Sequence, residues 1–272
     1  MFWKKLKRYV YDFGQPVLIR FGENEFFTES IVSERLILNL LENFTENSIY
    51  AAQSEINSGF ITIRGGHRVG ISGTCVFENG KIKNIRYISS LNIRVAREVK
   101  GCGNFLISEL YKNNYFENTL ILSSPGCGKT TLLRDMIRGL SVSGNNISVI
   151  DERAEIAATY KGIPQNDLGP RTDVMNNCRK DTGIRMMIRS MAPSIIATDE
   201  IGDNKDVDAI YDANFAGIKL LLTAHGDSIL DVPSRLSKIK LFRNIVILKK
   251  DKRPGVIKNI YKLKEDKYVI NY

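Results

Sequence analysis

Between Leu120 and Ser141 an apolar run is followed by a glycine-containing loop and then by a second apolar pattern with helical spacing. The junction reads Gly-Cys-Gly-Lys-Thr-Thr, starting at Gly126. Glycines leave the backbone N–H groups of such a loop free to surround an anion, and a helix that starts near Lys129 directs the positive end of its dipole to the same point. We therefore expect a phosphate-binding loop. Its expected residues are Ser124, Pro125, Gly126, Cys127, Gly128, Lys129, Thr130 and Thr131.

Two side chains of this loop are suited to ATP with Mg²⁺. Lys129 can reach the β and γ phosphates, and the Thr130 hydroxyl is placed to bind Mg²⁺. The run resembles the Walker A signature G-x-x-x-x-G-K-[ST], except that Ser123 occupies the first glycine position. The alternative is a glycine-rich turn that carries a surface lysine. We disfavour it because the apolar residues from Leu132 to Leu140 give the following helix a buried face, as the motif requires.

Polar residues that could act on a phosphate follow three further apolar runs. Asp151 and Glu152 follow one run, Asp199 and Glu200 a second, and His225 a third. Because the carboxyl ends of parallel strands meet at one edge of a sheet, we expect these side chains to gather beside the phosphate-binding loop. One acidic pair would hold Mg²⁺ through water and the other would orient the attacking water. We expect the histidine to bond the γ phosphate or that water, in preference to a packing role.

The pattern of apolar residues along the chain changes near residue 100. Thr28–Asn57 has helical periodicity, whereas Phe60–Val99 consists of short runs rich in Ile and Val, with Asn79-Gly80 as a hairpin turn. The run "VKGCGN" contains two glycines in four residues and marks the boundary. We expect a smaller α+β domain over residues 1–100 and an α/β domain over residues 101–272.

The α/β assignment rests on short apolar strands that alternate with helical patterns. Strands of four to six residues with little alternation are typical of a mainly parallel sheet covered on both faces. After them, basic and apolar residues alternate around Arg253-Pro254-Gly255, which predicts a closing antiparallel hairpin.

The net charge of the chain indicates anionic partners but does not choose one class among them. The 272 residues include 39 Lys and Arg against 30 Asp and Glu, and the resulting net charge of +9 suits nucleotides, nucleic acid or an anionic membrane. No apolar run approaches the roughly 18 residues of a membrane span, and the basic start does not read as a secretory signal. Two histidines and four cysteines without a Cys-x-x-Cys pair offer little for a zinc site. We expect a cytoplasmic protein.

The order of the motifs resembles the secretion ATPase superfamily of type II secretion and type IV pilus motors. The phosphate-binding loop is followed by "VIDERAE" as an acidic box, "IRSMAPSIIATDEIGD" as a Walker B run and "AGIKLLLTAHG" as a histidine box. Within that superfamily, the runs "ITIRGGHRVGISG", "LNIRVAREVKG" and "DLGPRTDV" resemble the family of stage III sporulation protein AA. The resemblance extends over nearly the whole chain, from about Leu18.

The resemblance implies a RecA-like P-loop ATPase that works as a homo-hexamer. It also implies peripheral association with membrane-embedded proteins of a channel between mother cell and forespore. In this pattern the N-terminal domain lies over the nucleotide of a neighbouring subunit and supplies arginine fingers. The matching residues are Arg68, Arg94 and Arg97, with Arg189 on the ATPase side.

Two questions stay open from the sequence. In the usual P-loop assignment Asp199 serves Mg²⁺ and Glu200 is the base. In the secretion-ATPase assignment the base is Asp151 or Glu152 in the acidic box, and Glu200 joins Thr130 and Asp199 around the metal. We favour the second, because the acidic box otherwise has no task. Alternatives to the secretion motor are an ATPase stimulated by nucleic acid, suggested by the charge and the basic tail, and a nucleotide-binding switch without turnover.

Overall fold

The computed structural model describes residues 6–113, 115–232, 234–238, 240–265 and 267–271, and it divides into two compact units. The first unit comprises the chain up to Arg97 together with Ala158–Gln165. The second comprises Glu98–Ala157 and the chain from Asn166 onward. The division at Arg97 lies close to the boundary expected at residue 100. Nothing in the sequence indicates that Ala158–Gln165 packs with the first unit.

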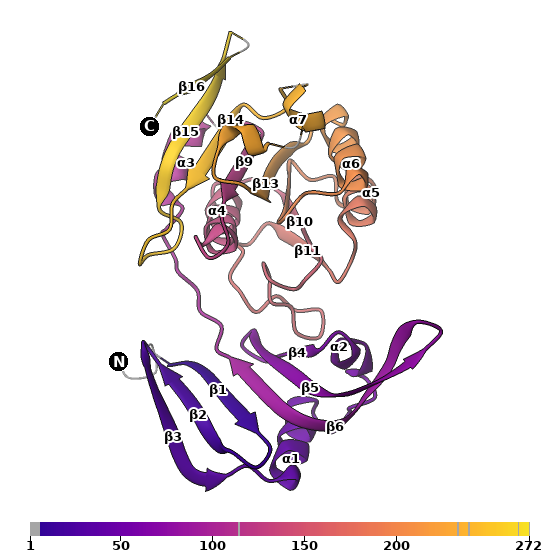
Figure 1. Ribbon diagram of the computed structural model, residues 1–272. Helices are drawn as coiled ribbons and strands as arrows, with labels where there is room; N and C mark the ends of the chain where they lie inside the picture. Colours follow the sequence, from indigo (N-terminus) through magenta and orange to yellow (C-terminus); the bar gives the residue numbers. More distant parts are fainter. Residues whose placement is uncertain (1–5, 114, 233, 239, 266, 272) are drawn as a thin grey trace. The chain divides into compact units, whose positions relative to one another are not determined.

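Within the described residues, the first unit is built on a six-stranded antiparallel sheet in the order β3-β2-β1-β6-β5-β4 (Figure 1). Its core forms between this sheet and two helices, around Ile37, Leu41 and Leu91. The elements are β1 (Leu6–Asp12), β2 (Pro16–Phe21), β3 (Asn24–Ile31), α1 (Glu34–Phe44), α2 (Gln53–Asn57), β4 (Phe60–Ile63), β5 (His67–Glu78) and β6 (Lys81–Arg94).

The helical part of this unit is shorter than the sequence predicts. Helix α1 begins after Ser33, whose hydroxyl accepts a hydrogen bond from the N–H of Leu36 and so caps the helix. The expected helical residues from Thr28 to Ile31 instead belong to β3, where they pair with β2. Strands β1, β2 and β3 are not predicted, because their alternation is irregular and β3 is exposed along most of its length.

The β part agrees better with the expectation. Asn79 and Gly80 have φ of 51° and 74°, as a tight hairpin between β5 and β6 requires. The short runs after this turn form one long strand, β6, with an irregularity where Tyr87 adopts a φ of 48°. A local kink of this kind breaks the alternation that sequence reasoning uses to join segments.

The second unit contains, among the described residues, an eight-stranded sheet in the order β11-β10-β12-β13-β9-β14-β15-β16. A small hairpin, β7 (Tyr111–Lys112) and β8 (Tyr115–Phe116), stands apart from it. The strands of the large sheet are β9 (Thr119–Ser123), β10 (Ile147–Asp151), β11 (Thr172–Asn176), β12 (Ile195–Thr198), β13 (Lys219–His225), β14 (Asn244–Leu248), β15 (Ile257–Lys264) and β16 (Lys267–Ile270). The helices are α3 (Asn104–Leu110), α4 (Lys129–Val142), α5 (Lys180–Met191), α6 (Asn204–Phe215) and α7 (Ser234–Lys238).

Parallel pairing from β11 to β14 fixes where the polar strand ends lie. Strand β9 pairs in parallel with both β13 and β14, and β12 pairs in parallel with both β13 and β10. Helix α4 covers one face of the sheet, and α5 and α6 cover the other (Figure 1). Side chains of β9 alternate between the two cores, with Ile121 on the α4 side and Leu120 and Leu122 on the opposite side. The carboxyl ends of these strands therefore share one edge.

The closing hairpin predicted around Arg253–Gly255 is confirmed as β14 and β15, which pair antiparallel. Strand β16 extends this hairpin, and β11 adds an edge strand next to β10. The sequence does not predict β11, because Thr172–Asn176 is polar and partly exposed. The part of the chain that the structure describes has no helix long and apolar enough to cross a membrane.

Candidate functional site

The expected phosphate-binding loop connects β9 to α4. Gly126 and Gly128 adopt φ of 80° and 89°, a left-handed conformation that favours glycine. Gly128 is the N-cap of α4 and makes no side-chain cap bond, so the first N–H groups of the helix lack acceptors within it. The exposed residues Ser124, Pro125 and Gly126 form the open part of the loop. The loop therefore has the backbone shape and the free donors that bind an anion.

Lys129, His225 and Glu200 form a connected row beside this loop. The Lys129 ammonium donates to the carbonyl of Ser123 at 3.0 Å and lies 3.2 Å from His225 Nδ1. Nε2 of the same histidine lies 3.4 Å from a Glu200 carboxylate oxygen. Because an ammonium has only donors, Nδ1 is the acceptor and Nε2 carries the proton that faces Glu200. Three residues that the sequence expects at one edge are thus brought together.

Lys129 is unusually buried for a lysine, with 7% of its surface exposed. Burial lowers its pKa, and the nearby carboxylates, Glu200 foremost, oppose that shift. A buried ammonium with one carbonyl and one imidazole as partners has spare donor capacity. It would gain from a strong anion at the adjacent loop.

Glu200 is held from several sides. Its second carboxylate oxygen is 2.5 Å from Arg153 Nη1, and its N–H donates to Thr223 Oγ1 at 3.0 Å. Its φ of 46° is left-handed, which is costly for a residue with a side chain and persists only where neighbours enforce it. Arg153 is a site residue that sequence reasoning missed. The available signal is its position inside the acidic box, directly after Asp151 and Glu152.

Asp199 is a buried carboxylate without a hydrogen-bond partner. It is 1% exposed, and neither of its oxygens has an acceptor or donor contact among the described residues. Burial raises the pKa of Asp199 to about 7, and Asp151 adds to the shift, while Lys180 opposes it. A buried charge of this kind is costly unless a cation or a metal-bound water joins it. This orphaned carboxylate fits the expected role toward Mg²⁺.

Asp151 has a structural role that differs from the catalytic one expected. Its Oδ1 accepts N–H bonds from Glu155 at 2.8 Å and Ile156 at 3.1 Å, and its Oδ2 accepts one from Ala157 at 2.8 Å. Arg134 of α4 holds the same loop through the carbonyls of Glu155 and Ile156. A fully buried carboxylate with both oxygens engaged is unsuited to accept a proton from water. These bonds give Asp151 a structural role, and its catalytic role stays a prediction.

Glu152 is paired with a buried lysine. Its carboxylate lies 2.5 Å from the ammonium of Lys180, the first residue of α5, which is 6% exposed. Sequence reasoning missed Lys180, because a lysine at the start of a helix normally indicates a solvated position. The acidic box thus has two tasks in the structure. Asp151 fixes the loop that follows β10, and Glu152 neutralises Lys180.

Three of the arginines expected to act on a nucleotide lie in the first unit. In the first unit, Arg94 is exposed at the end of β6 and has no hydrogen bond or ion pair to any described residue. Arg97 is also exposed, and its guanidinium donates to the carbonyl of Leu6. The Arg68 guanidinium stacks on the Phe60 ring, 3.4 Å from its centroid.

Arg189 lies away from the phosphate-binding loop of its own chain. Helix α5 begins at the carboxyl edge, where Lys180 meets Glu152. Beyond its end, the N–H of Ser194 bonds the carbonyl of Asn146, which precedes β10, so the helix ends at the amino edge. Arg189, in the last turn, is about 14 Å along the axis from Lys180. Arg189 therefore does not lie beside the phosphate-binding loop of its own chain, and its assignment to the site stays a prediction.

A metal ion here would depend on few protein ligands. Among the described residues, no three His, Cys, Asp or Glu side chains are grouped to hold a metal. Mg²⁺ usually keeps several waters and binds through one or two protein groups plus substrate phosphates. The Thr130 hydroxyl, at the first turn of α4, and the carboxylate of Asp199 are compatible with that mode.

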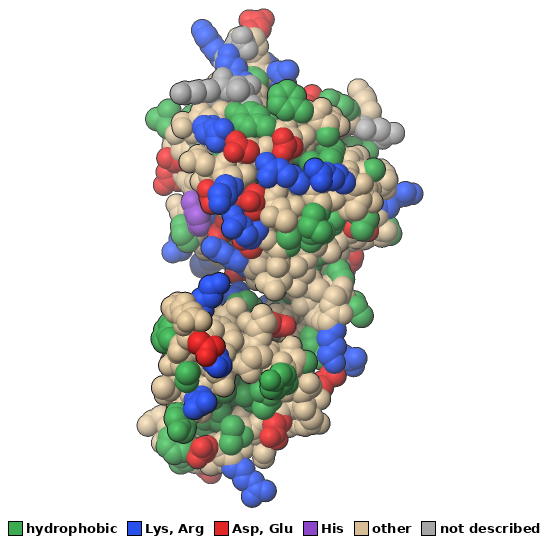
Figure 2. All heavy atoms as spheres, turned by 90° about the vertical axis from the view of Figure 1, so that its right-hand side faces the viewer, with side chains coloured by type: hydrophobic (Ala, Val, Ile, Leu, Met, Phe, Trp, Pro, Cys, Tyr) green, Lys and Arg blue, Asp and Glu red, His purple; other side chains and the backbone are tan. Residues whose placement is uncertain are grey.

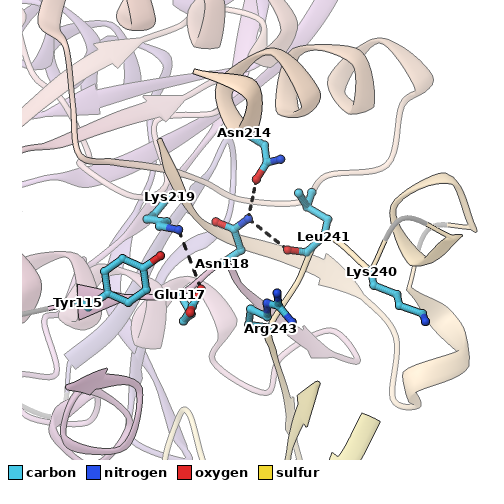
Figure 3. A pocket seen from close by; sticks show the side chains of 8 residues that line it. All are labelled: Tyr115, Glu117, Asn118, Asn214, Lys219, Lys240, Leu241 and Arg243. Carbon is cyan, nitrogen blue, oxygen red and sulfur yellow. Dashed lines mark hydrogen bonds and ion pairs between the residues drawn. The ribbon is translucent and has the colours of Figure 1, made fainter. Parts of the chain in front are cut away.

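A separate cavity of about 310 Å³ lies at the amino edge of the same sheet, at the opposite ends of β9 and β13 from the site (Figure 3). Asn118 forms its floor and donates to Asn214 Oδ1 at 2.9 Å and to the Leu241 carbonyl at 3.1 Å. Its own side-chain oxygen accepts the N–H of Leu220 at 3.1 Å. These bonds join α6, β13 and the segment that precedes β14. Asn118 is therefore a structural cross-link at the floor of the cavity.

The surface over α5 and α6 mixes charges of both signs. Figure 2 shows basic and acidic side chains interspersed on this face of the second unit. The ion pairs Arg185–Asp212 and Arg235–Asp208, each at 2.8 Å, contribute to that pattern. A nucleic-acid backbone favours a stripe of one sign, which this face does not present.

The second unit is an α/β domain with a mixed, largely parallel sheet and a phosphate-loop geometry after β9, and solved structures share this fold. The ATPase DotB of Yersinia pseudotuberculosis matches 96% of this chain and 76% of its own, with a TM-score of 0.64 and 14% identity. The pilus retraction motor PilT, solved with ADP, matches 94% of this chain and 78% of its own, with a TM-score of 0.59 and 14% identity. At such identities the likeness establishes the fold of secretion and pilus ATPases.

Sequence comparison identifies the family. Residues 2–268 match the family described as "Sporulation stage III, protein AA", and the chain belongs to it. Stage III sporulation protein AA of Bacillus subtilis (strain 168) is 40% identical over 272 aligned positions, which cover 95% of this chain and 87% of that protein. The resemblance drawn from the motifs is thereby confirmed.

Proposed function

We propose that this protein binds ATP with Mg²⁺ at the β9–α4 loop and hydrolyses it to ADP and phosphate as a secretion-type motor. The observation that carries the proposal is the row of Lys129, His225 and Glu200 beside a loop with two left-handed glycines. Its fold, shared with ATPases of secretion and pilus systems, is further support. A nucleotide-binding switch would not need a carboxylate and a histidine directed at the same point as the lysine.

In this proposal the loop amides and Lys129 hold the β and γ phosphates, and the ammonium exchanges its bond to Ser123 for phosphate oxygens. Thr130 and Asp199 would hold Mg²⁺. Bound Mg²⁺ supplies neutralisation of the charge that develops on the phosphoryl oxygens. A bound metal ion would favour the carboxylate form of Asp199, because a nearby positive charge lowers the pKa of a carboxyl group.

Glu200 is the residue best placed to orient and deprotonate the attacking water. It lies within reach of His225, which contacts Lys129, whereas Glu152 is tied to Lys180. The ion pair with Arg153 holds the Glu200 carboxylate in position. This assignment agrees with the usual P-loop pattern and departs from the acidic-box base that the sequence favours. The bonds of Asp151 to the loop after β10 and the ion pair of Glu152 with Lys180 support it.

Three single substitutions test the proposal. Lys129→Ala is expected to abolish ATP binding in a titration calorimetry experiment. Glu200→Gln is expected to keep ATP affinity within about threefold and to lower the hydrolysis rate by about 10² or more, the usual worth of a general base. Glu152→Gln is expected to lower the rate by less than about tenfold, since it removes only an ion pair. Unchanged turnover in Lys129→Ala would reject the site, and a reversed order of the two glutamate variants would return the base to the acidic box.

Because the chain belongs to a sporulation family, the proposal includes a role in spore formation. The motor would energise a channel between mother cell and forespore, through contacts with membrane-embedded proteins. A strain carrying Glu200→Gln is expected to make normal amounts of the protein and to be blocked in spore formation. Normal sporulation in that strain would separate the ATPase activity from the role of the family. A turnover increase with single-stranded DNA that vanishes at high salt would favour the nucleic-acid alternative instead.

A further inference from the structure

The loop between β14 and β15 rests directly on the phosphate-binding loop. We call residues Lys249–Gly255, with the sequence Lys-Lys-Asp-Lys-Arg-Pro-Gly, the basic loop. The N–H of Gly255 donates to the carbonyl of Cys127 at 2.9 Å. A Cβ added to Gly128 would lie 2.5 Å from Pro254 Cβ and 2.7 Å from the Gly255 nitrogen. The two backbones are therefore packed together as closely as glycine allows.

The basic loop is fixed at both ends. The N–H of Lys249 bonds the carbonyl of Val256 at 2.9 Å, which closes the β14–β15 hairpin. Gly255 is buried with a φ of 74°, and a Cβ there would approach the Leu132 side chain of α4 to 3.3 Å. The N–H of Arg253 bonds the carboxylate of Asp251 at 3.2 Å. The loop is thus held against both the phosphate-binding loop and the first turns of α4.

The cations of the basic loop have no anionic partner in the part of the chain that the structure describes. Lys249, Lys250, Lys252 and Arg253 are exposed, and their side chains make no hydrogen bond or ion pair with any described residue. Asp251 is the one acidic residue among them. Like charges held close together repel each other, and a polyanion nearby relieves that repulsion.

The backbone contact places two of these cations within reach of a bound phosphate. The Cα of Pro254 lies 2.8 Å from the position of a Cβ on Gly128. Consecutive Cα atoms are about 3.8 Å apart, so the Cα of Arg253 lies within about 8 Å of the Cα of Gly128. An arginine or lysine side chain is long enough to cross that distance. Lys252 is one residue further along the loop.

We infer that the basic loop is a second wall of the nucleotide site in the same chain. Pro254 and Gly255 support the shape of the phosphate-binding loop, and Lys252 and Arg253 contact the polyphosphate of the bound nucleotide. The inference rests on the proposed function, because it takes ATP as the ligand of the β9–α4 loop. It adds binding residues that lie more than 120 positions after that loop, in a turn that the sequence predicts only as part of a closing hairpin.

The test measures ATP affinity of the full chain by titration calorimetry. The double variant Lys252→Gln with Arg253→Gln is expected to bind ATP about tenfold more weakly at low salt, with the deficit shrinking as salt rises because charge contacts are screened. Lys264→Gln with Lys267→Gln is the matched control, since it removes the same charge at the far end of β15. The control is expected to bind like the unmodified chain. Arg253→Lys, which keeps the charge, is expected to recover most of the affinity in the presence of Lys252.

A second pair of variants tests the support of the phosphate-binding loop. Gly255→Ala and Gly217→Ala both strain a left-handed residue, with φ of 74° and 78°, but a Cβ at Gly217 meets nothing within 4 Å. Both are expected to lower thermal stability, and only Gly255→Ala is expected to weaken ATP binding.

The inference is overturned if the double variant binds ATP like the unmodified chain at every salt concentration while Lys129→Ala loses binding. In that outcome the nucleotide site stands and the basic loop has no part in it. If Lys129→Ala also binds normally, the proposed function fails first. Equal loss of affinity in the double variant and in its matched control would likewise overturn the inference, since the effect would then follow from net charge alone.

Discussion

At the scale of single residues, Asp199 is a group of the site whose charged form is unfavourable in its surroundings. Its carboxylate is buried, lacks hydrogen-bond partners and has a pKa raised to about 7, against 3.8 in an unstructured chain. The folded chain therefore binds the proton more tightly than the unfolded chain does. Between about pH 4 and pH 7 the unfolded state has released this proton and the folded state retains it, so stability falls as pH rises through this window.

Replacing Asp199 with asparagine should consequently stabilise the chain and inactivate it. Asp199→Asn is expected to raise the free energy of unfolding by about 1–3 kcal/mol at pH 8, with little change at pH 4. Mg²⁺-dependent hydrolysis is expected to be lost. Denaturant unfolding at several pH values measures the first effect and phosphate release the second. A variant that is less stable than the unmodified chain at pH 8 would contradict the buried-charge argument.

The same residues show what sequence can predict about a site. Lys129, Glu200 and His225 follow apolar strands, and parallel pairing alone brings strand ends to one edge, so their meeting is predictable. The roles of Asp151 and Glu152 are not. These roles depend on the path of the loop after β10. The N–H groups of this loop bond the carboxylate of Asp151, and the carboxylate of Glu152 pairs with Lys180. Loop paths carry no periodic signal, so partners such as Arg153 are found only in the structure.

At the scale of elements, predictability follows the regularity of burial. Strand β9 is buried at every position and is predicted from its apolar run. Strand β3 is exposed over most of its length, and its apolar residues Phe26 and Phe27 are adjacent, so no single face is indicated. The same reasoning covers β11, which gains its place from pairing with β10 rather than from its own composition.

Asn118 is the element-scale feature with the largest expected effect on stability. It lies just before β9, and its side chain joins α6, the start of β13 and the segment leading to β14. Asn118→Ala leaves a buried N–H and a buried carbonyl without partners, and we expect it to cost about 2–4 kcal/mol. Asn204→Ala, at an exposed position of α6, is the control and should change stability by less than about 0.5 kcal/mol. Urea unfolding measures both free energies. Equal effects of the two substitutions would contradict the stabilising role of the Asn118 side chain.

At the scale of the whole molecule, the first unit carries a row of three arginines on adjacent strands. Arg94 on β6 is directly opposite Arg8 on β1 and directly opposite Arg68 on β5. Opposite residues of antiparallel strands point to the same face about 5 Å apart, and like charges in such pairs are destabilising. A row of this kind is suited to an anion that lies outside the unit. The resemblance to secretion ATPases implies such an anion, namely the phosphates of a nucleotide bound to a neighbouring copy.

Mixing two inactive variants distinguishes a finger that acts between copies from one that acts within a copy. Arg94→Gln removes the finger and leaves its own phosphate-binding loop intact, whereas Lys129→Ala removes nucleotide binding and leaves the finger. Each variant alone is expected to lose about 10² or more in rate. In a randomly mixed ring, about a quarter of the sites pair an intact loop with an intact finger from the next copy, so the mixture should recover activity in that proportion. Arg86→Gln, an exposed arginine on the same strand, should keep full activity alone. Sedimentation with a non-hydrolysable ATP analogue verifies that mixed assemblies form, and mixed assemblies without recovered hydrolysis would rule out a finger supplied by the neighbour.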